Sequence, residues 1–429
     1  MSEYIEITGG APVSGAVAIS GAKNAALPML MASLLSAEPC VFENVPNLED
    51  VNLTLHLLEH LGAQTEFSGS RIRVVVPQLL ATEASYSLVK ALRASFWVLG
   101  PLLARGRAAR VALPGGDIIG ARPVDMHLAA LAQMGADIKV KHGVVFASAV
   151  SGLKPADIDL RFPSVGATHQ VMMAAALAPG VTRIKGAARE PEVIALADMI
   201  NRMGGEVIGA GSSNIEIHGK EELGGCEVTL IGDRIEAGTY LLAACASGGS
   251  LRADGVKPAH LGKFLDILTA MGVSVECGDN YVSVRRAGAL KPVHVTTGPF
   301  PEFATDLQAP LMAALCFADG ESSIEETVFE GRFGHVSELC RMGADIRVAD
   351  RLATIFGKPK LTGAVVEAHD IRAGAALVIA AAASEGESQI HDVHHLRRGY
   401  QTLESKLRGM GIKVGVKYSD AEDVMFTGC

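Results

Sequence analysis

The chain has 429 residues, of which 49% are hydrophobic, 5% aromatic and 20% charged, and its formal net charge at pH 7 is −9. This length predicts two or three domains with large aliphatic cores, and the negative charge argues against a nucleic-acid-binding surface. Seven cysteines without a CxxC pair indicate reduced thiols. With no signal sequence and no apolar run long enough to span a bilayer, we expect a cytoplasmic protein without a membrane partner.

One pattern occurs six times from the N-terminus to the C-terminus. A helix-like run ends in Leu-Gly or Met-Gly, and a strand-like alternation of apolar and polar residues follows, with a period of about 70 residues. A glycine at this point suits the left-handed conformation that ends a helix. The six glycines are Gly62, Gly135, Gly204, Gly272, Gly343 and Gly411.

Each copy of the pattern begins with an alanine-rich helix that has almost no polar face. A helix that is apolar all round is buried. We therefore expect six αβ units, three in each half of the chain, in which strands and an outer amphipathic helix surround a central helix. The alternative is an ordinary α/β fold. The predicted buried helices cover 25–37, 94–104, 167–178, 238–246, 307–318 and 374–383.

The second copy is longer than the others by about five residues, and the extra length falls in 113–125. Three glycines and two prolines predict a loop of special backbone geometry. This loop carries Asp117, Arg122 and Asp125. It is either a tolerated surface insertion or the place where this copy has acquired a function.

The starts of the buried helices also differ between the copies. A helix N-terminus attracts anions, so an acidic residue is the ordinary choice there and a cation opposes the helix dipole. The cations found at several starts suggest that an anionic ligand, carrying phosphate and carboxylate groups, supplies the negative charge. The residues at these starts are Lys23, Asn24, Arg93, Ser164, Arg234, Glu236, Asp306 and Arg372.

The chain resembles the enolpyruvyl transferase family over its whole length, in the branch whose acceptor is a UDP-sugar. The sister branch, which acts on shikimate-3-phosphate, lacks the GARPVD signature. The matching segments are 21–24 (GAKN), 92–95 (LRAS), 113–116 (LPGG), 120–125 (GARPVD), 163–168 (PSVGAT), 188–192 (AREPE), 305–308 (TDLQ), 332–335 (RFGH) and 398–400 (RGY).

The resemblance implies a fold of the α/β class. This fold is an inside-out α/β barrel of two domains, with three αβ units in each domain. The N-terminal strand would belong to the second domain. The implied domains are 22–231, which carries the mobile catalytic loop 113–125, and 1–21 together with 232–429. A cleft between the domains would close on the substrate.

The implied reaction moves the enolpyruvyl group of phosphoenolpyruvate to the 3-hydroxyl of UDP-N-acetylglucosamine and releases phosphate, in peptidoglycan synthesis. No cofactor and no metal is implied, and the two substrates are the implied partners. The implied catalytic residues are Asp117, Asp306, Lys23 and Arg398. The implied substrate-binding residues are Lys23, Asn24, Arg93, Arg122, Pro123, Val124, Asp125, Met126, Ser164, Val165, Gly166, Asp306, Val328, Arg332, Arg372 and Arg398.

The chain departs from the family pattern at the acid of the mobile loop, where most members have a cysteine and this chain has Asp117. An ordinary Asp has a pKa of about 3.9 and an ordinary Cys about 8.5. Burial and a nearby dianionic phosphate would raise the pKa of Asp117, whereas neighbouring arginines would lower it. Because fosfomycin alkylates the loop thiol of the family, the resemblance implies a fosfomycin-insensitive enzyme.

Three other functions remain open. A non-catalytic relative could bind the nucleotide sugar and regulate the pathway, a member of the shikimate branch would use another acceptor, and a sliding clamp also contains repeated αβ units. The histidines of 391–395 (HDVHH) suggest a metal cluster, but the segment reads as a strand or turn in which the side chains diverge. Trp97 lies in an apolar run and is expected in the core.

Overall fold

The computed structural model describes residues 2–84, 86, 89, 92–115, 119–120 and 123–419. Two compact units emerge from this part of the chain. Unit 1 contains residues 2–20, 119–120 and 232–419, and unit 2 contains the described residues of 21–115 and 123–231. Each unit has its own hydrophobic core. We propose that these units are the two domains expected from the sequence, 22–231 and 1–21 with 232–429.

Each unit contains three four-stranded sheets of one common topology. An edge strand pairs in parallel with the first inner strand, and the next two pairings are antiparallel. In unit 2 the sheets are β14 (Cys226–Thr229), β3 (Cys40–Glu43), β5 (Arg71–Val75), β4 (Gln64–Ser68); β6 (Glu83–Ala84), β7 (Ala108–Ala112), β9 (Val144–Ser148), β8 (Asp137–Lys141); and β10 (Asp157–Asp159), β11 (Gly180–Lys185), β13 (Asn214–Gly219), β12 (Glu206–Ile208).

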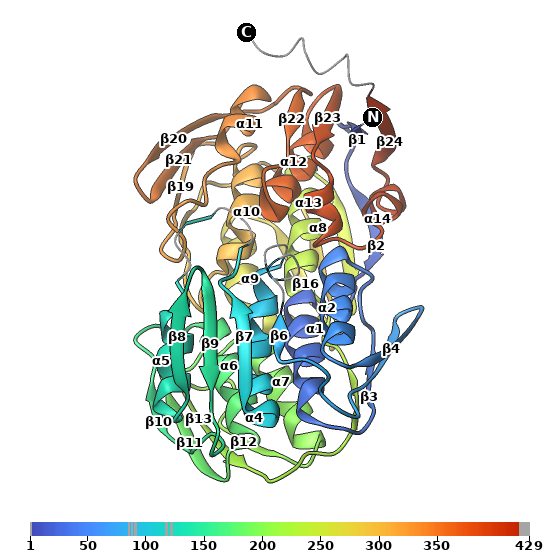
Figure 1. Ribbon diagram of the computed structural model, residues 1–429. Coiled ribbons are helices and arrows are strands. Elements are labelled where there is room, and N and C mark those ends of the chain that lie inside the picture. Colours follow the sequence, from blue (N-terminus) through green and yellow to red (C-terminus); the bar gives the residue numbers. More distant parts are fainter. Residues whose placement is uncertain are drawn as a thin grey trace. The chain divides into compact units, whose positions relative to one another are not determined.

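Unit 1 repeats this order with strands from both ends of the chain. Strand β1 pairs with β23 and β24, so the first and last described strands share a sheet (Figure 1). The sheets are β2 (Ser14–Ala18), β15 (Ser250–Asp254), β17 (Tyr281–Arg285), β16 (Ser274–Cys277); β18 (His294–Thr296), β19 (Glu321–Glu325), β21 (Leu352–Phe356), β20 (Asp345–Ala349); and β22 (Val365–Glu367), β23 (Glu387–His391), β1 (Ser2–Thr8), β24 (Lys413–Ser419).

The six central helices are buried, as the alanine-rich runs predict. In unit 1, α8, α10 and α12 pack against one another (Figure 1). The central helices are α1 (Lys23–Ala32) with η1 (Ser33–Leu35), η2 (Arg93–Val98) with α4 (Leu99–Gly106), α6 (Val165–Ala175), α8 (Arg234–Ser247), η4 (Thr305–Leu307) with α10 (Gln308–Leu315), and α12 (Ile371–Ala383).

All six central helices begin before the predicted apolar runs, and the difference is largest for α8 and α12. Helix α8 begins at Arg234 rather than at 238, and α12 begins at Ile371 rather than at 374. Both first turns contain buried charged residues, Arg234 and Glu236 in α8 and Arg372 in α12. The predicted runs contain only apolar and small side chains, so they leave out first helical turns whose polar side chains are also buried.

The outer helices end as the marker glycines predict. In all six, the glycine has a positive φ, between 82° and 112°. At each glycine, its N–H and the N–H that follows turn back to carbonyls of the last turn, as in the Schellman motif. The outer helices are α2 (Glu49–His60), α5 (Asp125–Gln133), α7 (Pro191–Arg202), α9 (Gly262–Ala270), α11 (Val336–Arg341) and α14 (Leu403–Gly409). The six-unit prediction is therefore confirmed.

The histidine-rich segment 391–395 begins as the strand and turn that the sequence indicated and ends in a short helix that was not predicted. His391 ends β23, Asp392 adopts a positive φ of 56°, and His394 begins the short helix α13 (His394–Arg397). A further short helix, η3 (Pro258–His260), precedes α9.

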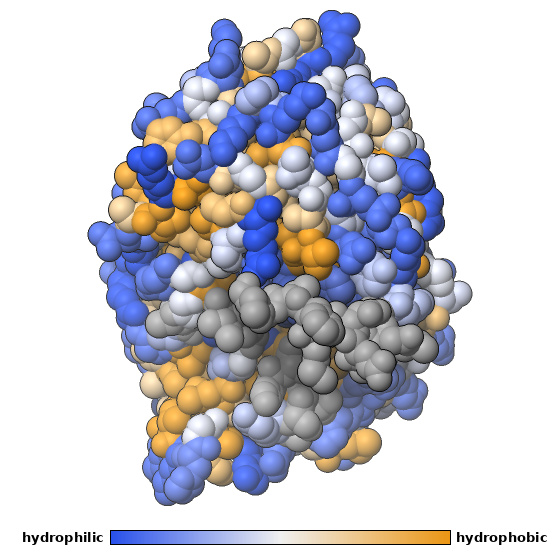
Figure 2. All heavy atoms as spheres, turned by 90° about the horizontal axis from the view of Figure 1, so that it is seen from above, coloured by the Kyte–Doolittle hydropathy of each residue, from blue (hydrophilic) through white to orange (hydrophobic). Residues whose placement is uncertain are grey.

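Hydrophobic side chains also reach the surface. On the face shown in Figure 2 they form several groups with hydrophilic residues between them. Within the described residues, no helix combines the length and the apolar character needed to cross a membrane.

Candidate functional site

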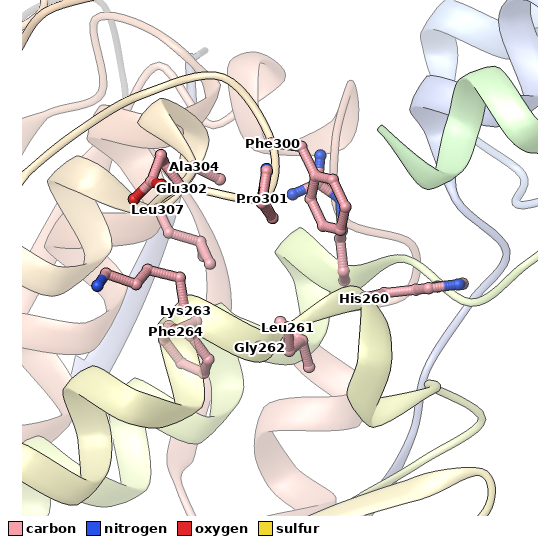
Figure 3. A pocket seen from close by; sticks show the side chains of 11 residues that line it. His260, Leu261, Gly262, Lys263, Phe264, Phe300, Pro301, Glu302, Ala304 and Leu307 are labelled. Atoms are coloured by element: carbon pink, nitrogen blue, oxygen red, sulfur yellow. The ribbon is translucent and has the colours of Figure 1, made fainter. Parts of the chain in front are cut away.

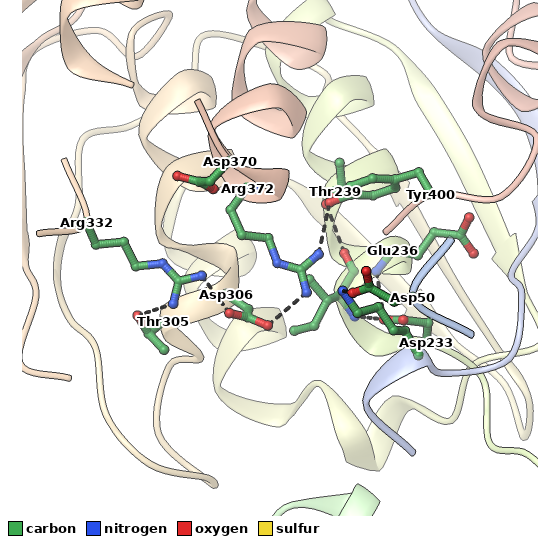
Figure 4. Close-up of polar contacts among 12 residues, drawn as sticks. Asp50, Asp233, Glu236, Thr239, Thr305, Asp306, Arg332, Asp370, Arg372 and Tyr400 are labelled. Atoms are coloured by element: carbon green, nitrogen blue, oxygen red, sulfur yellow. Dashed lines mark hydrogen bonds and ion pairs between the residues drawn. The ribbon is translucent and has the colours of Figure 1, made fainter. Parts of the chain in front are cut away.

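A cluster of charged side chains in unit 1 surrounds the carboxylate of Asp306. One Asp306 oxygen accepts a hydrogen bond from Nη2 of Arg332 at 2.6 Å, and the other accepts from Nη2 of Arg372 at 2.8 Å (Figure 4). The arginine side chains are only 5% and 9% exposed, whereas that of Asp306 is 24% exposed. The carboxylate is thus fixed between two guanidinium groups and still reaches solvent.

Neighbouring side chains orient both arginines. Nη1 of Arg332 donates to the Thr305 hydroxyl at 3.0 Å, and that hydroxyl donates to the buried carboxylate of Glu326 at 2.8 Å. Nη1 of Arg372 contacts the hydroxyl of buried Tyr400 at 3.4 Å (Figure 4). The sequence analysis assigned roles to the two arginines and Asp306 but not to these supporting groups, although Thr305 and Tyr400 lie in its matching segments 305–308 and 398–400.

The surroundings of Asp306 control its acidity. Burial by itself would raise the pKa of Asp306, but the charges and hydrogen bonds of Arg372 and Arg332 outweigh burial and hold this pKa well below its usual range. Asp306 is therefore ionised at neutral pH, and it is a weak proton acceptor for as long as both guanidiniums stay in place.

Acidic residues cap two of the buried helices that begin with a cation. The Asp233 carboxylate accepts from the backbone N–H groups of Ile235 and Glu236, and the Asp370 carboxylate accepts from those of Arg372 and Ala373. At the starts of α8 and α12 the protein itself thus supplies negative charge, so the cation there does not by itself indicate an anionic ligand. Each cap lies one or two residues before the arginine that the sequence analysis singled out.

Unit 2 places Lys23 at the start of its own buried helix. Lys23 is the first residue of α1, and its ammonium lies 2.5 Å from the carboxylate of buried Asp50. Asn24 follows it and is half-buried. Here too the protein contributes a negative charge, from a residue of α2 that the sequence analysis did not identify.

The loop 113–125 is described only in part, and both Asp117 and Arg122 lie outside the described residues. The Gly331 N–H donates to the Ile119 carbonyl at 3.1 Å, next to Arg332 along the chain. Gly120, with φ of 121°, lies so close that a Cβ there would be 2.3 Å from a carboxylate oxygen of Glu330. This part of the loop therefore packs against the segment that leads into the arginine cluster.

The C-terminal end of the loop leads into α5. Pro123 is exposed, Val124 and Met126 are half-buried, and Asp125 pairs with Arg161 at 2.6 Å. The charge and hydrogen bond of Arg161 lower the pKa of Asp125 although burial opposes this. Asp125 is therefore held in its ionised form.

The segment of Ser164, Val165 and Gly166 forms the start of α6. The Ser164 hydroxyl accepts from the N–H of Ala167 at 3.2 Å and so caps the helix. The Gly166 carbonyl accepts from the Trp97 indole at 3.0 Å. A Cβ on Gly166 would lie 2.9 Å from the ring of His127, so only glycine fits there.

His127 and Trp97 therefore act as supports of this turn. His127 is buried and packs edge-on against Phe96. Burial and the charge of Arg93, the first residue of η2, lower the pKa of His127 to about 4. Trp97 was expected in the core, but it is half-buried and packs against the core of unit 2.

The two remaining predicted residues lie in unit 1. Val328 is half-buried, and its N–H donates to Glu326 at 2.8 Å. Arg398 is half-buried and directly follows α13. Glu326 therefore holds both Val328 and Thr305, which joins this turn to the arginine cluster.

A separate small pocket lies between η3, α9 and the turn before η4 (Figure 3). Its lining includes Arg234, whose guanidinium lies 5.7 Å from the centre of the Phe300 ring. Arg234 is one of the helix-start cations of the sequence analysis, but none of the implied catalytic or substrate-binding residues lines this pocket, and we assign it no role. In the part of the chain that the structure describes, no group of three or more His, Cys, Asp or Glu residues is arranged to hold a metal ion.

The chain matches known proteins over nearly its whole length. Residues 7–407 match the family described as EPSP synthase (3-phosphoshikimate 1-carboxyvinyltransferase). The chain is 47% identical to UDP-N-acetylglucosamine 1-carboxyvinyltransferase 1 of Caldanaerobacter subterraneus subsp. tengcongensis, over 94% of this chain and 97% of that protein. It is 46% identical to the UDP-N-acetylglucosamine 1-carboxyvinyltransferase of Methylocella silvestris, over 95% of this chain and 98% of that protein.

Solved structures show the same fold. The enolpyruvyl transferase NikO of Streptomyces tendae matches 98% of this chain and all of its own chain, with a TM-score of 0.87 and 27% identity. EPSP synthase of Acinetobacter baumannii matches 97% of this chain and all of its own, with a TM-score of 0.74 and 19% identity. The predicted fold class is thus confirmed, and the chain belongs to the EPSP synthase family of enolpyruvyl transferases.

Proposed function

We propose that this protein transfers the enolpyruvyl group of phosphoenolpyruvate to the 3-hydroxyl of UDP-N-acetylglucosamine and releases phosphate, in peptidoglycan synthesis. The names of relatives that are about half identical over nearly the whole chain support the choice of acceptor. The observation that carries the chemistry is the Asp306 carboxylate between two buried guanidiniums. Such a group offers a proton acceptor and two anion-binding side chains within a few ångströms.

In this proposal Asp306 accepts the proton of the sugar hydroxyl. Its lowered pKa makes it a poor base in the structure without substrate. When phosphoenolpyruvate binds, Arg332 and Arg372 would also interact with its phosphate and carboxylate groups. Their weaker hold would raise the pKa of Asp306, so that the base becomes competent only when the second substrate is present.

The other predicted residues have binding roles in the proposal. Lys23, Arg122 and Arg398 bind phosphoenolpyruvate as cations. The residues proposed to contact the nucleotide sugar are Asn24, Arg93, Arg122, Pro123, Val124, Asp125, Met126, Ser164, Val165, Gly166 and Val328. Three of these residues form the N-cap and first turn of helix α6. The free backbone N–H groups at such a helix start favour the binding of a diphosphate.

Asp117 is proposed as the acid that protonates the methylene carbon of phosphoenolpyruvate. Protonation there places positive charge on the neighbouring carbon, which the sugar oxygen then attacks. Phosphate leaves from that carbon, and the new methyl group gives up a proton, which restores the carbon–carbon double bond. Because a carboxylate is a weaker nucleophile toward an epoxide than a thiolate, we also propose that the enzyme is insensitive to fosfomycin. Both substrates are cytoplasmic metabolites, so we propose the cytoplasm as its location.

The test is phosphate release from phosphoenolpyruvate with each acceptor in turn. We expect release with UDP-N-acetylglucosamine, a product whose mass has increased by an enolpyruvyl group, and no release with shikimate-3-phosphate. Release with shikimate-3-phosphate but not with UDP-N-acetylglucosamine would place the protein in the other branch. Binding of UDP-N-acetylglucosamine without release of phosphate would support a regulatory protein and overturn the proposal.

A further inference from the structure

Two cysteines that are far apart in the sequence lie opposite each other in one sheet of unit 2. Cys40 begins β3, Cys226 begins β14, and the two are direct partners in the parallel pairing of these strands. Neighbouring strands lie about 4.8 Å apart, which falls within the Cα separation of about 4.4–6.8 Å found in disulfides. This pair was not predicted from the sequence, because 185 residues separate the two positions.

Both side chains point to the same face of the sheet. In β3 the inward positions are Cys40 and Phe42, and in β14 Val228 is buried two residues after Cys226. The described cysteines are in the free state, so Cys40 and Cys226 are a pair of thiols on the same face of neighbouring strands.

The backbone fixes this end of the two strands. The Cys226 N–H donates to the Pro39 carbonyl at 3.1 Å, and the Gly225 N–H donates to the Glu38 carboxylate at 2.8 Å. The chains approach so closely that a Cβ on Gly225 would lie 2.3 Å from the Pro39 oxygen. The starts of β3 and β14, which carry the two cysteines, are therefore held close to each other.

The two thiols differ in the way expected of an attacking and a resolving cysteine. Cys226 is half-buried, and its hydrogen bond with Cys40 and the positive charge of Arg202 lower its pKa although burial opposes this. Cys40 is fully buried, and its hydrogen bond with Cys226 together with burial raises its pKa. A partly exposed thiol of lowered pKa is the one that reacts first.

We propose that Cys226 and Cys40 form a reversible redox site, which a low-molecular-weight disulfide converts into an intramolecular disulfide between β14 and β3. In the first step the Cys226 thiolate attacks one sulfur of the small disulfide, a mixed disulfide forms, and one small thiolate leaves and takes up a proton. In the second step Cys40 loses its proton to the second leaving thiolate and bonds to the Cys226 sulfur. Two cysteine thiols are oxidised, and one small disulfide is reduced to two thiols.

The disulfide would fasten a strand that leads directly to the candidate site. Two residues after β14, the Ile231 carbonyl accepts a hydrogen bond from the Ala22 N–H at 2.7 Å, next to Lys23. Oxidation would therefore hold this edge of unit 2 in place rather than open it. Closing so long a loop of chain restricts the unfolded state, so the oxidised form should be the more stable one.

The experiment treats the full-length reduced protein with oxidised glutathione, quenches with acid, alkylates the remaining thiols and maps peptides by mass spectrometry. We expect a peptide pair that joins Cys40 to Cys226, with a mass lower by two hydrogens, whereas exposed Cys277 and Cys340 acquire only glutathione. Cys40→Ser should stop at a glutathione adduct on Cys226. Glutathione on Cys277 and Cys340, with Cys40 and Cys226 both still alkylated, would overturn the proposal.

A stability measurement provides an independent readout. Trp97 is the only tryptophan in the sequence and lies in unit 2, so its fluorescence follows the unfolding of the unit that contains the cysteine pair. The urea midpoint of the wild type should rise after oxidation and return after reduction, and Cys277→Ser should behave identically. No such shift should occur in Cys226→Ser. An equal shift in Cys226→Ser would contradict the assignment.

Discussion

The arginine cluster around Asp306 makes a quantitative prediction about stability. Removal of the carboxylate in Asp306→Ala leaves two nearly buried guanidiniums without their shared partner. Loss of one member of a buried ion pair costs about 3–5 kcal/mol, because the remaining charge is not compensated. Arg372→Met leaves Asp306 paired with Arg332, so we expect only the loss of one charged hydrogen bond, about 1.5–3 kcal/mol.

The double variant separates the interaction from other effects of each change. If Asp306 and Arg372 interact as the structure shows, the double variant should be less destabilised than the sum of the single variants by about 1.5–3 kcal/mol. The measurement is the free energy of unfolding in urea, followed by circular dichroism. The exposed pair of Arg73 and Glu66, at 3.4 Å and 42% and 73% exposed, is the matched control, and its coupling should stay below about 1 kcal/mol.

The pH dependence has a definite sign. Because the pKa of Asp306 is depressed in the folded protein, its ion pairs contribute fully above an unfolded pKa of about 4 and are lost as the pH falls through the lower folded value. The cost of Asp306→Ala should therefore be constant between about pH 5 and pH 8 and shrink only in strong acid.

A coupling between Asp306 and Arg372 no larger than that of the control pair would refute this account of the cluster.

Three further predictions concern the loop and the repeats. The wild-type enzyme should keep its activity in fosfomycin while Asp117→Cys loses it with time; a covalent adduct on Asp117 would contradict this. Asp117→Cys should also raise the pH optimum, since an ordinary Cys has a pKa of about 8.5 and an Asp about 3.9; an unchanged pH–rate profile would exclude Asp117 as the acid. Gly343→Ala should cost about 1–2 kcal/mol in urea unfolding although a methyl group has room there, because φ is 94°. The control Gly409→Ala, in α14 without a positive φ, should be neutral or slightly stabilising, and equal effects of the two changes would disprove the backbone explanation.

Periodic features of the fold could be predicted because they depend on local rules. The six marker glycines identify helix ends, since a positive φ disfavours any side chain. The alanine-rich runs identify buried helices, because a helix that is apolar all round is buried. Polar residues inside these helices, such as Arg234 and Glu236, were not predicted to be buried, because nothing local indicates their partners. Lys406, which pairs with Glu236 at 2.6 Å, is 170 residues away.

The candidate site shows the same division between local and distant information. A cation at a helix start suggested a bound anion, but the carboxylate beside Lys23 belongs to Asp50 and the one beside Arg372 belongs to Asp306. These pairings depend on tertiary packing, and neither residue type nor spacing reveals them. The Cys40–Cys226 pair escaped notice for the same reason, because parallel strands join residues from distant parts of the chain.

The measurement that tests the central claim most directly is phosphate release against pH for the wild type, Asp117→Cys and Asp306→Ala, with phosphoenolpyruvate and UDP-N-acetylglucosamine. We expect activity in the wild type, a profile displaced to higher pH in Asp117→Cys, and a loss of activity in Asp306→Ala while the nucleotide sugar still binds. Wild-type activity in Asp306→Ala, or no phosphate release by the wild type at any pH, would contradict the proposed enolpyruvyl transfer.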